Sequence, residues 1–77
     1  MVAMKNIVQS GNTISLDCFK ENDENKHFTL VLDATTCDII SSSLTSYSIY
    51  ARQAAIKIKE LLAGSEPLPS EATSWWC

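Results

Sequence analysis

The longest regular pattern in the sequence lies at residues 45–64, TSYSIYARQAAIKIKELLAG. Thr45 or Ser46 can accept a hydrogen bond from the first amide groups of a helix. Alanines and long unbranched side chains, which favour helix formation, follow them. Gly64 is the residue type at which helices commonly end. The segment therefore predicts one helix that begins near Thr45 and stops at Gly64.

Most apolar side chains of this helix fall on one broad side of a helical wheel. We expect that side to cover a sheet, with its alanines allowing a close approach. Its members are Tyr47, Tyr50, Ala51, Ala54, Ala55, Ile58, Leu61 and Leu62.

Ile49 and Ile56 lie on the other side of the wheel, among charged and amide side chains. Their spacing of seven residues places one above the other, and Ala63 continues the line. Single exposed apolar residues are common on protein surfaces and need no partner. A line of them along one helix face instead predicts a surface that another segment or another protein covers.

Upstream of the helix, residues 5–21, KNIVQSGNTISLDCFKE, predict two strands around a turn at Gly11-Asn12. Both turn residues tolerate the positive φ that a tight hairpin requires. In the second strand Ile14, Leu16 and Cys18 alternate with polar residues. This period of two turns one face of the strand inward.

Residues 20–26, KENDENK, contain no apolar residue and predict a solvated loop. Residues 27–34, HFTLVLDA, predict a third strand with Phe28, Leu30 and Leu32 on one face. A turn of aspartate and threonine residues follows. Residues 37–44, CDIISSSL, then predict a weaker fourth strand at the edge of the sheet.

Residues 28–42, FTLVLDATTCDIISS, resemble the hairpin of PepSY-type domains, in which a strand ends in Val-Asp-Ala, turns through Thr-Gly and resumes in apolar residues. Cys37 stands where that pattern has glycine. Turns of this kind also recur in unrelated proteins, because short aspartate and threonine side chains bond to their own backbone. We therefore interpret the segment as a hairpin turn.

These patterns predict a single α+β domain over residues 1–64, an antiparallel meander of three to four strands with one C-terminal helix packed on one face. Residues 65–77, SEPLPSEATSWWC, contain Pro67 and Pro69 and predict an extended tail that ends in Trp-Trp-Cys. The tail is long enough to bring Trp75 and Trp76 back along the helix, in the same chain or on a neighbouring copy.

The composition excludes several classes of function. The chain has 77 residues and a net charge of −3, without the basic excess that nucleic-acid binding uses. No apolar run approaches the length of a signal peptide or a membrane span, so we expect no membrane association. Three cysteines without a secretion signal indicate reduced thiols and a cytoplasmic location.

The residues with reactive side chains do not form a recognisable catalytic pattern. Cys18, His27 and Cys37 are the candidates for a metal site, but they lack the close pairwise spacing of zinc ligands. Cys18 continues the apolar alternation of its strand and is expected in the core, whereas Cys37 is expected to be exposed at its turn. We expect no metal, no cofactor, no catalytic residue and no enzymatic activity.

The favoured function is therefore a small non-catalytic protein–protein interaction, regulatory or inhibitor domain that self-associates as a homodimer. Phages and other mobile elements encode domains of this kind. One alternative is a cysteine-based metal-binding or redox module. Another is a precursor whose C-terminal peptide SWWC is modified. The expected partner-binding residues are Ile49, Ile56, Leu68, Trp75 and Trp76.

Overall fold

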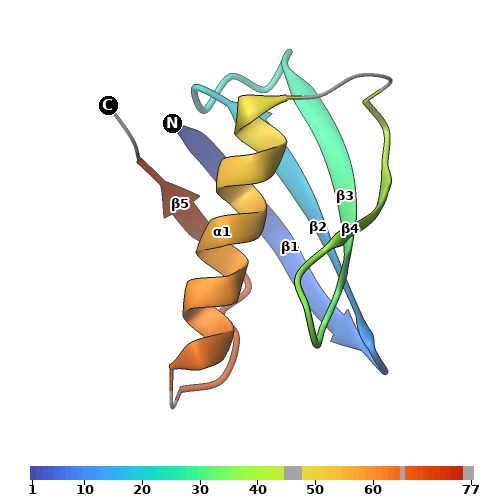
Figure 1. The fold of residues 1–77 in the computed structure, drawn as a ribbon. Coiled ribbons are helices and arrows are strands. Elements are labelled where there is room, and N and C mark those ends of the chain that lie inside the picture. The colour runs from blue at the N-terminus through green and yellow to red at the C-terminus, as the bar shows by residue number, and fades with distance from the viewer. Residues whose placement is uncertain (45–47, 65, 76–77) are drawn as a thin grey trace.

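The structure, a computed structural model, describes residues 1–44, 48–64 and 66–75. It contains a five-stranded antiparallel sheet of order β4-β3-β2-β1-β5 and one helix across one face of it (Figure 1). The predicted α+β class, a meander followed by one helix, is confirmed. The elements are β1 (Val2–Ser10), β2 (Thr13–Lys20), β3 (His27–Asp33), β4 (Ile39–Ser42), α1 (Ile49–Ala63) and β5 (Ala72–Ser74).

The hairpin between β1 and β2 turns where the sequence predicts. Ser10 pairs with Thr13, and Gly11 between them has a φ of 59°, a left-handed conformation that glycine adopts without strain. The strand β1 begins earlier than the pattern predicts, because the chain is already paired with β2 at Val2. A bulge interrupts the pairing between Lys5 and Val8.

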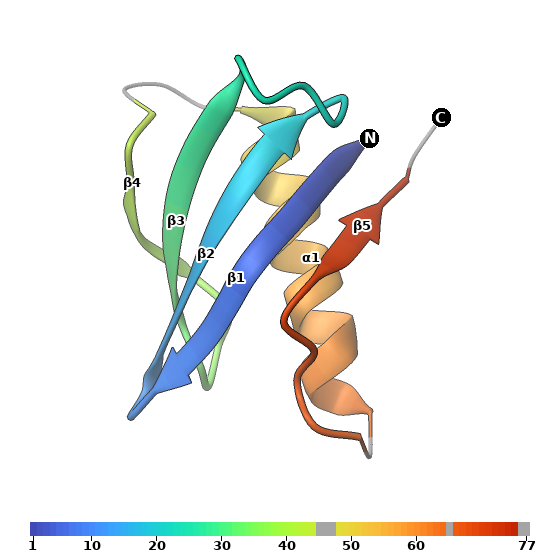
Figure 2. The same ribbon diagram turned by 180° about the vertical axis from the view of Figure 1, so that it is seen from behind.

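The helix covers the sheet face that the alternation in β2 and β3 predicts to be apolar. Six side chains on these strands are at most 2% exposed: Ile14, Leu16, Cys18, Phe28, Leu30 and Leu32. Ala51, Ala54 and Ile58 on α1 are buried against this face. Viewed from behind, the other face of the sheet has none of the described elements in front of it (Figure 2).

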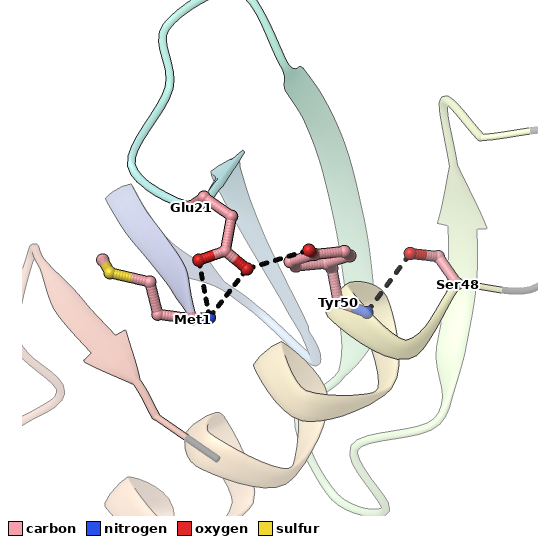
Figure 3. Close-up of polar contacts among 4 residues, drawn as sticks. All are labelled: Met1, Glu21, Ser48 and Tyr50. Atoms are coloured by element: carbon pink, nitrogen blue, oxygen red, sulfur yellow. Dashed lines mark hydrogen bonds and ion pairs between the residues drawn. The ribbon is translucent and has the colours of Figure 1, made fainter. Parts of the chain in front are cut away.

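The helix begins later than the sequence predicts. Ser48 is its N-cap, with extended backbone angles and a side-chain oxygen that accepts a hydrogen bond from the Tyr50 N–H at 3.2 Å (Figure 3). Ser48 is not among the caps that the sequence pattern predicts, and the two predicted caps, Thr45 and Ser46, lie outside the described residues. Gly64 follows the last helical residue, as predicted.

Replacing Ser48 by alanine is expected to lower the free energy of unfolding by about 1 kcal/mol, because the Tyr50 N–H in the first turn of α1 loses its acceptor. Replacement by aspartate keeps an acceptor and is expected to retain most of the stability. Urea denaturation of the two variants and the parent checks this. Equal losses for alanine and aspartate would contradict the capping role.

Glu21 connects the start of the loop after β2 to the first turn of α1. Its carboxylate accepts a hydrogen bond from the Tyr50 hydroxyl at 2.9 Å and pairs with the Met1 ammonium at 3.1 Å (Figure 3). The hydrogen bond from Tyr50 is the main cause that lowers the pKa of Glu21, and the same contact raises the pKa of Tyr50. Three distant segments therefore meet at one exposed carboxylate.

Replacing Glu21 by glutamine is expected to make the protein less stable at neutral pH and equally stable in acid. Because the folded state lowers the pKa of Glu21 from its usual 4.5, its contribution is present above that pH and disappears as the pH falls through the folded value. The urea midpoints of the variant and the parent, measured at pH 7 and in acid, check this pH dependence. A difference between the two midpoints that is as large in acid as at pH 7 would contradict it.

The same variant offers a second readout. In a Tyr47→Phe background, spectrophotometric titration follows Tyr50 alone. Loss of the Glu21 carboxylate is expected to move the pKa of Tyr50 down towards its ordinary value of 10.0. An unchanged titration would contradict the contact between the two side chains.

The chain after Gly64 returns to the sheet and adds a fifth strand that the sequence pattern does not predict. In β5, Ala72 pairs with Met4 and Ser74 pairs with Val2, so the strand runs antiparallel to β1. Leu68 packs against the core on the way. Pairing with β5 satisfies backbone groups at the edge of β1, where Val2 and Met4 are fully buried.

Candidate functional site

The two isoleucines that the wheel sets apart lie on the outer side of α1. Ile49 and Ile56 are each 38% exposed, and Ala63, seven residues further on, is also exposed. Ile58, only two residues after Ile56, is fully buried on the opposite side of the helix. The helix therefore has one apolar side against the sheet and a narrower apolar line facing away from it.

A hollow separates this line from β4. It has a volume of about 370 Å³, and its walls include Ile56 from α1 and Ile39 from β4. Ile39 is 44% exposed, and Ala55 and Cys37 also line the hollow. An exposed apolar side chain of the sheet edge thus lies across a shallow depression from the middle of the helix.

A second hollow lies on the other side of α1, towards β5. Its volume is about 250 Å³, and Ile56 and Trp75 both line it. Trp75 follows β5 directly and is 74% exposed. Because β5 and β4 flank the helix on opposite sides (Figure 1), Ile56 lies between two further apolar residues. We call Ile39, Ile49, Ile56 and Trp75 together the apolar band.

The predicted partner-binding residues are therefore distributed unevenly. Trp75 and Ile56 line the same hollow, and Ile49 and Trp75 are both exposed. Leu68 is half-buried against the core. Trp76 lies outside the described residues. Ile39 was not predicted, because no sequence spacing places a residue of β4 beside the helix.

Charged side chains of both signs border the apolar band: Arg52, Lys59 and Asp38 line the hollow beside β4, and Lys57 and Glu60 line the hollow towards β5. The helix carries Arg52, Lys57 and Lys59, three of the six basic residues, and only Glu60 of the nine acidic ones. Among residues 1–44, 48–64 and 66–75, no carboxylate lies within ion-pair distance of these three cations. Asp38 lines the hollow beside β4, where its carboxylate accepts a hydrogen bond from the Thr36 hydroxyl.

The three residues considered for a metal site do not come together. Cys18 is fully buried on the sheet face that α1 covers, whereas His27 is exposed and contacts Asp17 on the opposite face. Cys37 packs near the helix at the other end of β3. In the described part of the chain, no group of three or more potential ligand side chains could hold a metal ion.

The expectation that Cys37 is exposed is wrong. Its φ of 62° places this residue in the left-handed region, and the residue is 9% exposed within the core cluster. Burial raises the pKa of its thiol, while the charge of Lys59 acts in the opposite direction. The sequence identifies the turn correctly, but it does not reveal that the turn directs this side chain under the helix.

The open face of the sheet carries a polar contact between neighbouring strands. The Asp17 carboxylate lies 3.3 Å from the His27 ring and accepts a hydrogen bond from the Asn6 side chain at 2.7 Å. The bond from Asn6 is the main cause that lowers the pKa of Asp17. The Phe19 ring lies 5.0 Å from the His27 ring. These cross-strand contacts on an exposed surface account for the residues as stabilisers of the sheet.

Comparison with known proteins does not extend these observations. No protein-family model and no curated protein matches the sequence, and no solved structure matches the chain. In the part of the chain that the structure describes, no helix is long and apolar enough to cross a membrane. The surface around Ile56 is therefore the feature on which a function can be argued.

Proposed function

We propose that this protein is a non-catalytic interaction domain that regulates or inhibits another protein in the cytoplasm, and that the apolar band is its binding surface. One observation carries the proposal: exposed apolar side chains from β4, α1 and the end of β5 line two hollows that share Ile56. Scattered apolar residues are ordinary on a surface, but neighbouring ones from separate elements are typical of binding sites.

The composition of the band supports this reading. Aromatic residues and arginine are enriched in protein interfaces; the band contains Trp75, and Arg52 lines the hollow beside β4 together with Ile56. The buried residues of α1 pack against the sheet, so the exposed side chains of the helix project from a rigid element. A rigid support lowers the entropy lost on binding.

A photoreactive side chain introduced at position 56 tests the proposal in cells that produce the protein. It is expected to give a covalent adduct with a partner, because Ile56 lies at the centre of the band. The matched control is position 8, since Val8 is 55% exposed on β1 and does not belong to the band. Mass spectrometry identifies the adduct and tells a second copy of this chain from another protein.

Adding Ile49→Asp to the position-56 protein is expected to abolish the adduct while circular dichroism shows an intact fold, because the Ile49 side chain is exposed. Adducts of equal yield at positions 56 and 8, or none at 56, would contradict the proposal. An adduct of twice the chain mass would assign the surface to self-association.

A further inference from the structure

Two rows of side chains run side by side along the outer surface of α1. Ile49, Ile56 and Ala63 form an apolar row with a spacing of seven residues. Arg52 and Lys59, three residues after each isoleucine, form a second row with the same spacing, and both are exposed. In the heptad notation of helix pairs these are the a and d positions, which a second helix would contact.

A cation at each d position restricts what can pack there. Arg52 and Lys59 have no carboxylate within ion-pair distance among the described residues, so in the free protein water solvates their charges. Packing a purely apolar surface over this face would remove that water without compensation, which opposes binding. A partner that buries Ile56 therefore has to offer an acceptor to each cation.

A second copy of the same helix face satisfies this requirement only in part. If two α1 helices met in parallel, Arg52 would face Arg52 and Lys59 would face Lys59, and like charges brought together in this way oppose association. If they met antiparallel with Ile56 facing Ile56, Arg52 would lie opposite Glu60 of the other copy, but Lys59 would lie opposite Gln53 and gain no carboxylate. An acidic partner, which offers a carboxylate to both cations, therefore fits this face better than the homodimer that the sequence suggests.

We infer that the occupant of the apolar band is an acidic amphipathic helix of another protein. This inference rests on the proposed function and specifies its partner. Apolar side chains three and four residues apart would fill the hollows beside Ile56, and aspartate or glutamate residues flanking them would pair with Arg52 and Lys59. Arginine binds a carboxylate through two parallel hydrogen bonds, which fixes the orientation of the partner helix.

Selection from a randomised library of helical peptides on the immobilised full-length protein tests the inference. Enriched peptides are expected to carry apolar residues at helical spacing with flanking aspartate or glutamate. The protein with Arg52→Glu and Lys59→Glu is expected to bind such a peptide more than about tenfold more weakly. A peptide with lysine in place of its acidic residues is expected to bind this variant and not the parent.

The control variant carries Lys26→Glu, Gln9→Glu and Ser15→Glu, which changes the net charge by the same four units at exposed positions that line neither hollow of the apolar band. It is expected to bind the acidic peptide within about a factor of two of the parent at moderate ionic strength, because exposed charges are screened over distances of about 10 Å. Equal weakening by both variants would overturn the inference in favour of a non-specific effect of net charge.

The remaining outcomes separate the two proposals. Enrichment of peptides without acidic residues, bound with equal affinity by the charge-reversed protein but not by an Ile56→Asp variant, would overturn the inference and leave the proposed function standing. No enrichment, or binding unaffected by Ile56→Asp, would overturn both. Binding to phosphatidylserine-containing vesicles without binding to any peptide would also overturn both.

Discussion

Replacing Ile58 by alanine is expected to lower the free energy of unfolding by about 2–5 kcal/mol. Ile58 is fully buried in the core, so the change leaves a cavity between α1 and the sheet. A domain of this size has only a few kcal/mol of stability. The variant should therefore be largely unfolded at room temperature or in a low concentration of urea.

The matched control is Ile56→Ala, which removes the same atoms two residues earlier on the same helix. Ile56 is 38% exposed, and its loss is expected to cost less than about 1 kcal/mol. Urea denaturation followed by circular dichroism gives both values. Equal losses for the two variants would contradict the packing of α1, whereas a large difference separates the core side of the helix from the side proposed to bind a partner.

The Cys18 thiol is expected to react with iodoacetamide far more slowly in the folded protein than in urea. Burial, with a smaller contribution from the charge of Asp17, raises the pKa of Cys18 to about 12. Relative to the ordinary value of 9.0, this lowers the thiolate fraction at neutral pH by about a thousandfold. The surrounding core also blocks the approach of the reagent, since the residue is 0% exposed.

Pulse alkylation followed by peptide mapping measures this protection without any substitution, because each cysteine lies in a different part of the sequence. The rate at Cys18 in native buffer should approach the rate of global unfolding. Alkylation of Cys18 in native buffer as fast as in urea would contradict its burial. That result would also favour the alternative of a cysteine-based redox or metal-binding module, because such a module needs an accessible thiolate.

Local signals in the sequence predict the central part of the fold. The alternation through Ile14, Leu16 and Cys18 and the glycine at the first turn depend only on near neighbours in the chain. The weak strand of serines after Cys37 is at the edge of the sheet, as predicted. The helix wheel likewise identifies Ala51, Ala54 and Ile58 as part of the core side.

The features that the sequence does not reveal depend on residues that are distant in the chain. Ala72–Ser74 has no strand pattern of its own and becomes a strand only because the edge of β1 lies beside it. Ile39 joins the apolar band only through its position across a hollow from Ile56. Thr45, Ser46 and Ser48 are chemically similar and close together in the sequence, so the residue types alone do not identify which of them caps the helix.

The pairing of β5 with β1 also affects the order of events in time. It joins residues about seventy positions apart, whereas the other strands are linked by short turns, so the hairpins have the smaller entropy of closure and we expect them to form first. Among the described residues, β5 is joined to β1 by three residue pairs and by the hydrogen bond from Ile7 N–H to the Ser70 carbonyl just before it, so it can open while the longer ladders of the sheet stay closed. Hydrogen exchange should then be faster at Ala72–Ser74 than in β2, and each opening would carry Trp75 away from the helix.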